Sequence, residues 1–218
     1  MPSTSASELD AVTVDAMGTI VELDDPAPRL QRALAERGVD RDLDMVAAAF
    51  RAEVAYYLPR TLEGRDDESL ADLGQRCTAV FLEHAEAGLD PAEFAPAFLA
   101  SIVFQPLPGA AEGLARLRDA GLTLACVSNW DISLHGHLER AGLAEYFAEI
   151  VSSAEVGVAK PEAAVFVIAL DRLGVAPERA LHIGDGDGDR DGAAATGLAF
   201  EPPPVATLPE RLGLGRRP

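Results

Sequence analysis

The sequence has 218 residues, 48% hydrophobic and 25% charged, as is usual for a globular protein with one core and room for an insertion. Its 36 acidic residues outnumber its 18 basic ones, which gives a net charge of −18. A surface this negative repels phosphate backbones, so we expect no nucleic-acid partner. No apolar run approaches the roughly 18 residues of a membrane span, so no membrane association is expected either.

The two cysteines and the first residues bear on cellular location. Cys77 and Cys126 lie far apart and do not have the spacing of metal ligands. Residues 1–10 are polar and lack the basic and apolar regions of a signal peptide. We therefore expect a protein of the reducing cytoplasm. Both a monomer and a homodimer are compatible with the sequence.

The first predicted element is a buried strand over residues 11–14, which is short, apolar and partly β-branched and ends at Asp15. Apolar spacing and breaks at glycine and proline then predict four helices, over residues 30–37, 43–58, 69–87 and 92–100. Because this stretch contains no strand, we expect residues 25–100 to be an all-helical cap domain inserted into an α/β domain.

Strands and helices alternate after the predicted cap. Strands are predicted over residues 122–127, 150–151, 180–183 and 198–200, and helices over residues 110–120, 132–141 and 162–173, with a last short helix near residue 208. The alternation predicts a Rossmann-like parallel sheet built from residues 1–24 and 101–218. Ligands of such sheets bind beyond the carboxyl ends of the strands.

Reactive side chains follow four of these strands. Asp15 comes directly after the first strand, and polar residues follow the others: Ser128-Asn129, Lys160-Pro161, and Gly184-Asp185 with Asp189. Each of these short motifs, taken alone, is typical of a turn or a helix cap. Their occurrence in order, each at the same end of a strand, is much less expected by chance and predicts one shared pocket.

These residues resemble the four motifs of the haloacid dehalogenase (HAD) superfamily. Residues 12–19 resemble the first motif, residues 127–129 the second, Lys160-Pro161 the third, and residues 182–185 with Asp189 the fourth. The helical stretch matches the position of the cap in the subgroup with a helical (C1-type) cap. The resemblance spans nearly the whole chain and is specific for the superfamily but not for a substrate.

The resemblance implies that Asp15 attacks a small anionic substrate and forms a covalent ester, which water then cleaves. A carboxylate suits this role because it is already ionised at neutral pH. Ser128 and Asn129 are expected to bind the transferring group, and Lys160 is expected to offset negative charge. Two residues of the loop after the nucleophile complete the implied set: Gly18, which allows close approach of substrate, and Thr19, which braces the loop.

The acidic residues of the first and fourth motifs imply a metal ion. Asp15, Asp185 and Asp189 would place about three negative charges in one pocket, and a hard divalent cation would relieve their repulsion. With phosphate substrates Mg²⁺ is the natural choice. By resemblance, the backbone carbonyl of Met17 would be a further ligand.

Met17 departs from the phosphatase pattern. Many phosphatases of the superfamily have an aspartate at this position, which protonates the leaving oxygen, and a thioether cannot do so. General acid–base catalysis is worth about 10² to 10⁴ in rate. Either the substrate has a good leaving group, or another residue supplies the proton, or turnover is slow. Glu22 is a candidate donor, although it is also typical of a solvated loop, and His182 is interpreted as a core histidine.

Three hypotheses follow. The first is Mg²⁺-dependent hydrolysis of a small phosphorylated metabolite, favoured by Asp185 and Asp189. The second is a metal-independent 2-haloacid dehalogenase, because residues 15–19 also resemble those enzymes, whose halide leaves without a proton. In that case Arg51 would bind the substrate carboxylate, although it is also typical of a surface helix. The third is a binding protein that has kept the fold and lost turnover, which Met17 would explain.

Residues 187–192 also resemble the start of a calcium-binding EF-hand loop. The twelfth position of that loop would be Leu198 instead of the required glutamate, and a strand precedes it instead of a helix. The calcium interpretation is therefore disfavoured, and Asp187 and Asp191 are expected to face solvent.

Overall fold

The computed structural model describes residues 9–214, which divide into two compact units. The core unit comprises the chain up to Glu22 and from Gln105 onward, and the helical unit comprises Leu23–Phe104. The chain passes between the units through β2 (Val21–Asp24) and β3 (Val103–Pro106), which form a two-stranded sheet. The sequence did not predict these two strands, since each has only four residues and most of them are not buried.

The core unit is built on a five-stranded sheet with the order β5-β4-β1-β6-β7. The strands are β1 (Ala11–Val14), β4 (Thr123–Ser128), β5 (Glu149–Ser152), β6 (Ala180–Ile183) and β7 (Ala199–Glu201). All four neighbouring pairs are parallel. The short apolar run of β1 is fully buried, as expected of a central strand that is covered on both faces. The predicted α/β fold with a parallel sheet is confirmed.

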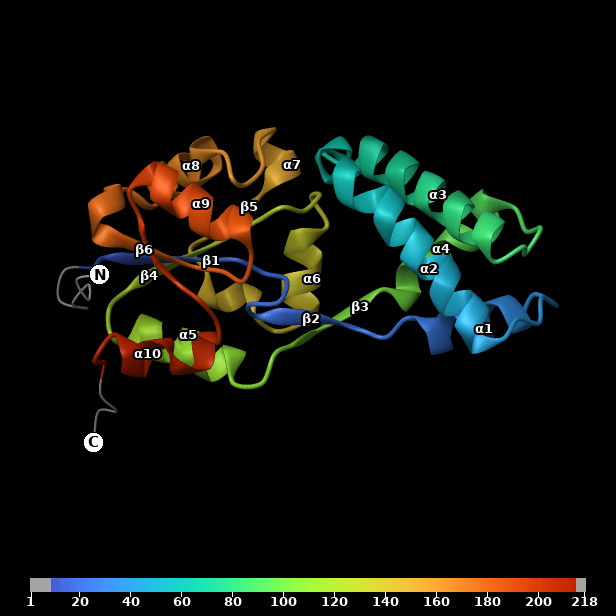
Figure 1. Cartoon of the computed structure of the whole chain (residues 1–218), viewed down its shortest axis with the longest axis horizontal. Helices are drawn as coiled ribbons and strands as arrows, with labels where there is room; N and C mark the ends of the chain where they lie inside the picture. Colours follow the sequence, from blue (N-terminus) through green and yellow to red (C-terminus); the bar gives the residue numbers. More distant parts are fainter. Residues whose placement is uncertain (1–8, 215–218) are drawn as a thin grey trace. The chain divides into compact units, whose positions relative to one another are not determined.

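Helices cover both faces of this sheet. They are α5 (Ala110–Asp119), α6 (Leu134–Arg140), α7 (Ser153–Val156), α8 (Ala163–Leu173), α9 (Asp187–Thr196) and α10 (Leu208–Arg211), with 3-10 turns η3 (Ala144–Tyr146), η4 (Pro177–Arg179) and η5 (Val205–Thr207). In Figure 1, α8 and α9 lie on one side of the sheet and α5 and α10 on the other. Phe166 and Leu170 of α8 pack against Ala11 of β1 and Val127 of β4.

The register of the strands brings the four predicted motifs to one edge. Val14, the last residue of β1, pairs with Cys126 of β4 and with Ile183 of β6. The backbone N–H of Asp15 donates to the carbonyl of Ile183 over 2.9 Å. Asp15 therefore lies beside the ends of both neighbouring strands, as the rule for parallel sheets requires.

Helix α9 was missed by sequence reasoning, which treated its aspartates and glycines as a loop. The Oδ2 atom of Asp189 accepts a hydrogen bond from the N–H of Gly186, just before the helix, over 3.1 Å. The acidic side chains of Asp187 and Asp189 also lie in the first turn, where they stabilise a helix dipole. A side chain at Gly192 would lie 2.3 Å from the Phe166 ring, so this glycine allows α9 to pack against α8.

The helical unit contains α1 (Ala27–Ala35), α2 (Leu43–Tyr57), α3 (Asp67–His84) and α4 (Pro91–Ser101), with a 3-10 segment η2 (Leu58–Glu63). Asp42 caps α2 by accepting from the N–H of Met45, and Asp66 caps α3 by accepting from Ser69. Phe81 stacks on Phe94 in the core of this unit, with ring centroids 6.1 Å apart. Within residues 9–214, no helix combines the length and apolar character needed to cross a membrane.

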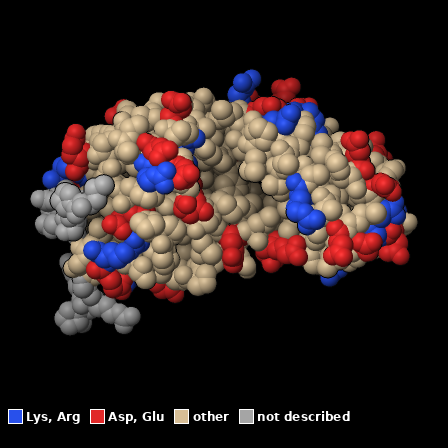
Figure 2. All heavy atoms as spheres, in the orientation of Figure 1, with Lys and Arg blue, Asp and Glu red and all other residues tan. Residues whose placement is uncertain are grey.

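Acidic and basic side chains are intermixed on one face of the structure. On the face shown in Figure 2, acidic side chains are spread across the molecule and basic side chains are interspersed among them. Among the described residues on this face, no large basic area is seen.

One ionisable group lies inside the helical unit. Glu53, on α2, is only 4% exposed and has a hydrogen bond with the Cys77 thiol of α3. Burial raises the pKa of Glu53 to about 7, because a carboxylate loses its hydration there. The folded unit therefore holds this proton more tightly than the unfolded chain does.

We predict that the free energy of unfolding of the helical unit falls as the pH rises from about 4.5 to about 7, by up to roughly 3 kcal/mol, and then levels off. Glu53→Gln should remove this fall, because an amide does not titrate. Calorimetric or urea unfolding at pH 5 and pH 8 measures the difference. Glu83→Gln, on the exposed face of α3, is the control and should keep the wild-type pH dependence. An equal pH dependence in Glu53→Gln and wild type would contradict the prediction.

Candidate active site

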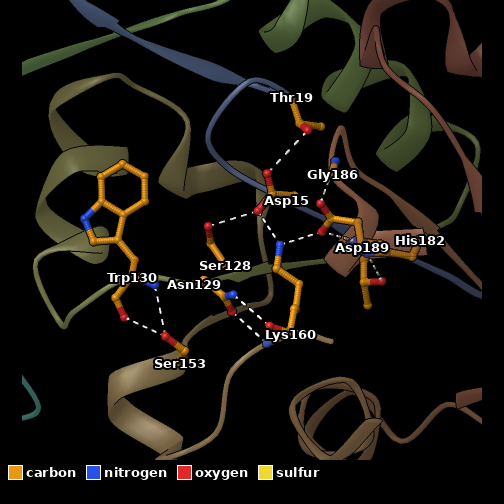
Figure 3. A network of polar contacts seen from close by, with 11 residues as sticks. Asp15, Thr19, Ser128, Asn129, Trp130, Ser153, Lys160, His182, Gly186 and Asp189 are labelled. Carbon is orange, nitrogen blue, oxygen red and sulfur yellow. Dashed lines mark hydrogen bonds and ion pairs between the residues drawn. The ribbon is translucent and has the colours of Figure 1, made fainter. Parts of the chain in front are cut away.

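Asp15 lies at the carboxyl end of β1 and is 5% exposed. Its Oδ1 atom accepts hydrogen bonds from the Ser128 hydroxyl (3.0 Å) and from the Lys160 ammonium (2.5 Å). The other oxygen, Oδ2, has a longer contact of 3.5 Å with the Thr19 hydroxyl. Figure 3 shows the side chains of Ser128, Lys160 and Thr19 pointing toward the carboxylate from separate parts of the chain. Of the two oxygens, Oδ2 is therefore the freer to react.

Lys160 is the centre of the charge network. Its Nζ atom lies 2.5 Å from Oδ1 of Asp15 and 2.5 Å from Oδ1 of Asp189. Burial opposes the ammonium charge, but the negative charges of Asp15 and Asp189 hold the pKa of Lys160 above its ordinary value. Asn129 fixes the backbone of this residue, because its side chain accepts from the Lys160 N–H (2.7 Å) and donates to the Lys160 carbonyl (3.0 Å).

Asp189 is held by three donors. Its Oδ1 atom contacts the Lys160 ammonium and the Nε2 atom of His182, the latter at 2.9 Å, and its Oδ2 atom accepts from the N–H of Gly186. Although burial opposes ionisation, the hydrogen bond from His182 and the charge of Lys160 hold the pKa of Asp189 below its ordinary range. Asp189 is therefore ionised at neutral pH.

Asp185 completes a group of three carboxylates. Ligand atoms of Asp15, Asp185 and Asp189 lie within 4.8 Å of one another, and Asp185 is the exposed member. Partial loss of hydration and the charges of Asp15 and Asp189 raise the pKa of Asp185. Three carboxylates against one ammonium leave two uncompensated negative charges when all are ionised. The oxygen ligands and the excess charge fit a hard divalent cation.

Two glycines make this arrangement sterically possible. Gly18 has φ +74°, and a Cβ there would lie 2.1 Å from Oδ2 of Asp185. A Cβ at Gly184 would lie 2.3 Å from Cγ of Asp189. Since these carboxylates lie directly against the backbone, side chains at either position would displace them.

The structure brings most of the predicted site residues together but not all. Asn129 contacts Lys160 and has no described contact with Asp15. The Met17 side chain is 39% exposed. Arg51 belongs to the helical unit, on the exposed side of α2, so its substrate-binding role stays a prediction.

Glu22 and the aspartates of the 187–192 segment have partners of their own. Glu22 lies in β2, where its carboxylate accepts a hydrogen bond from Gln105 over 3.1 Å. Asp187 and Asp191 both pair with Arg190 at the surface. The calcium-loop interpretation is wrong, because these residues lie in helix α9 instead of a loop.

Sequence reasoning missed two partners in the network. Thr13 contacts His182 through its hydroxyl, and the backbone of Gly186 holds Asp189. The prediction that His182 is a buried, hydrogen-bonded residue is confirmed. Polar residues inside the otherwise apolar strands β1 and β6 were the available signal, because only a partner within the core makes them favourable there.

We predict that Gly184→Ala destabilises the core unit by about 2 kcal/mol or more, because Asp189 is buried and cannot yield without losing its hydrogen bonds. Gly188→Ala is the matched control in the same segment, since its Cβ would meet Lys160 at an ordinary 3.7 Å. That substitution should change stability by less than about 1 kcal/mol, toward stabilisation. Urea unfolding followed by the fluorescence of Trp130, which lies in the core unit, measures both. Equal effects of the two substitutions would rule the steric argument out.

Comparisons with known proteins identify the family of the chain. A family model described as haloacid dehalogenase-like hydrolase matches residues 9–197. A glyceraldehyde 3-phosphate phosphatase of Methanopyrus kandleri is 38% identical over 96 residues, which are 43% of this chain and 41% of that protein. The chain thus spans less than half the length of this curated relative.

Two solved structures share the fold. A HAD phosphatase from Thermococcus onnurineus superposes with a TM-score of 0.62 at 24% identity, over 96% of this chain and all of that one. An L-2-haloacid dehalogenase from Xanthobacter autotrophicus, with chloropropionic acid covalently bound, gives 0.59 at 25% identity, over 96% of this chain and 85% of that one. Since the family model covers most of the 218 residues, the chain belongs to the haloacid dehalogenase-like hydrolase family.

Proposed function

We propose that the chain is a Mg²⁺-dependent hydrolase of a small phosphorylated metabolite that acts through Asp15. The observation that carries this proposal is the position of the Asp15 carboxylate. One of its oxygens is held by Ser128 and Lys160, and the other is nearly free, beside a second and a third carboxylate. Phosphatase activity of the Methanopyrus kandleri relative supports the substrate class. The helical unit would act as the cap that selects the substrate.

The reaction has two steps. Oδ2 of Asp15 attacks phosphorus, so that an aspartyl–phosphate bond forms while the bond to the leaving oxygen breaks. The leaving group departs as an alkoxide that takes its proton from solvent, because Met17 has none to give. Lys160 and Ser128 keep Oδ1 in place and offset the charge that gathers on the phosphoryl oxygens. Water then hydrolyses the acyl phosphate, releasing inorganic phosphate and restoring the carboxylate. Asn129 would act by holding the Lys160 backbone, and Thr19 by bracing the loop.

The residues present fit the metal. Mg²⁺ would be held by Asp15, Asp185, Asp189 and the backbone carbonyl of Met17, and would supply positive charge to the phosphoryl oxygens. Of the three carboxylates, Asp185 is exposed and has the most freedom to take a ligand position. Gly18 would let the substrate approach the loop closely.

A second candidate is the metal-independent 2-haloacid dehalogenase. Met17 favours it, because halide needs no proton to leave, and the Xanthobacter autotrophicus dehalogenase supports it by its shared fold. The two excess negative charges at the site count against it, because a haloacid brings a further carboxylate and no metal to balance it.

A substrate panel with Mg²⁺ and with chelator tests the proposal. We expect hydrolysis of phosphate esters and acyl phosphates with Mg²⁺ and at least about a hundredfold loss with chelator. Asp15→Asn should lower turnover by about 10⁴-fold or more, because the nucleophile is lost. Asp187→Asn, on the surface of α9, is the control and should behave as wild type. Halide release from a 2-haloacid with chelator would favour the dehalogenase instead, and no turnover of any compound would favour a binding protein.

The missing acid at Met17 gives a further prediction. Without a proton donor, kcat/KM should rise steeply as the pKa of the leaving alcohol falls along a series from alkyl to nitroaryl phosphates. Met17→Asp should flatten this dependence and raise the turnover of alkyl phosphates by up to about 10²-fold. Met17→Asn introduces a side chain of the same size as aspartate but without a titratable proton, so it should neither flatten the dependence nor raise the turnover of alkyl phosphates. A flat dependence in wild type, with chemistry limiting the rate, would show that another residue protonates the leaving group.

A further inference from the structure

His182 is a fully buried imidazole whose position is fixed from all sides. It is the register partner of Thr13, in the adjacent strands β6 and β1, and neither residue is exposed. The ring meets Phe166 edge-on, with centroids 4.8 Å apart and planes at 80°, and lies 6.3 Å from Phe200. These contacts leave the ring no room to flip without repacking the core.

The hydrogen-bond partners decide where the imidazole carries its proton. Nε2 lies 2.9 Å from Oδ1 of Asp189, and Nδ1 lies 2.9 Å from the hydroxyl of Thr13. An ionised carboxylate can only accept, so Nε2 must be the protonated nitrogen of a neutral ring. Nδ1 then accepts from Thr13, whose other contact, with the Leu181 carbonyl, is longer at 3.4 Å.

Asp189 connects His182 to Lys160 through one carboxylate oxygen. Its Oδ1 atom takes one hydrogen bond from His182 and one from the Lys160 ammonium, which also contacts Oδ1 of Asp15. Without the N–H of His182, Oδ1 keeps only the Lys160 donor, and the Gly186 N–H on Oδ2 is the one contact with a fixed backbone group that still orients the carboxylate. The ammonium would then follow Asp189 and leave the position that it shares with Asp15.

We propose that His182 is a positioning residue: the Asp189 carboxylate sets its tautomer, the Thr13 hydroxyl holds the ring through Nδ1, and His182 in turn fixes Asp189, which holds the Lys160 ammonium on Asp15. Figure 3 shows the part of this network from His182 to Lys160. The chain Thr13–His182–Asp189–Lys160 runs from the middle of the sheet to the reacting carboxylate. The consequence for turnover rests on the proposed function, but the geometry of the chain does not. Removing a residue that orients the groups at a reaction centre typically lowers activity by about 10- to 100-fold.

Nuclear magnetic resonance of the metal-free protein tests the geometry without a substrate. Lys160 is the only lysine of the sequence, so lysine labelled with nitrogen-15 at Nζ gives one ammonium signal. We expect a sharp signal in wild type that shifts and exchanges faster with water in His182→Phe. With labelled histidine, the signal that disappears in His182→Phe should belong to an Nε2–H tautomer. A proton on Nδ1, or an unchanged Lys160 signal in His182→Phe, would overturn the proposal.

Turnover distinguishes positioning from a purely structural role. His182→Phe should lower kcat by about 10- to 100-fold with little change in KM, and His182→Gln should restore most of it, because its amide N–H can reach Asp189. Thr13→Val keeps the shape of threonine and removes the hydroxyl. It should therefore shift the Lys160 signal in the same direction as His182→Phe does, but by a smaller amount. Thr123→Val, at an exposed threonine of β4, is the control.

The outcomes separate this inference from the proposed function. If no phosphate ester is turned over, the proposed function fails while the Lys160 signal still decides the inference. If His182→Phe does not fold, the wild-type tautomer and Thr13→Val decide it. Equal kcat in wild type, His182→Phe and Thr13→Val, with measurable turnover, would show that His182 only fills the core.

Discussion

The site depends on one buried ammonium that is shared between two carboxylates. Placing a charged amine inside a protein is costly, and here the two negative charges at 2.5 Å offset that cost. Each partner needs the others, since Asp15 and Asp189 would repel each other without Lys160. The Asp15 carboxylate is therefore held at one oxygen and nearly free at the other. The third carboxylate, Asp185, leaves the pocket negative and suited to a cation.

The composition shows how specific this requirement is. Of 18 basic residues, 17 are arginine, and the single lysine lies at the buried position between the Asp15 and Asp189 carboxylates. An ammonium is compact and can donate in three directions, whereas a planar guanidinium needs more room and prefers to meet one carboxylate with two parallel bonds. The narrow space between Asp15 and Asp189 fits the first geometry.

The parallel sheet and most of the residues gathered at its edge could be predicted from the sequence. Strand ends in a parallel sheet meet at one edge, so Asp15, Ser128, Lys160 and Asp185 could be placed together without a structure. The hydrogen-bond partners of a buried side chain could not be predicted, because they depend on the register between neighbouring strands. Thr13 and His182 read as ordinary strand residues until β1 and β6 are aligned. Helix α9 was missed because its glycines disfavour a helix locally, and close packing on Phe166 outweighs that preference.

The scarcity of amines has a consequence for the protein as a polyelectrolyte. Arginine side chains stay protonated far into the alkaline range, and the one lysine is buried with its pKa held high. Between about pH 7 and 9, few side chains at the surface change their charge. Electrophoretic mobility should therefore stay almost constant over that interval. A change in reaction rate at alkaline pH would then come from groups in the pocket or on the substrate, because the surface charge of the protein does not change.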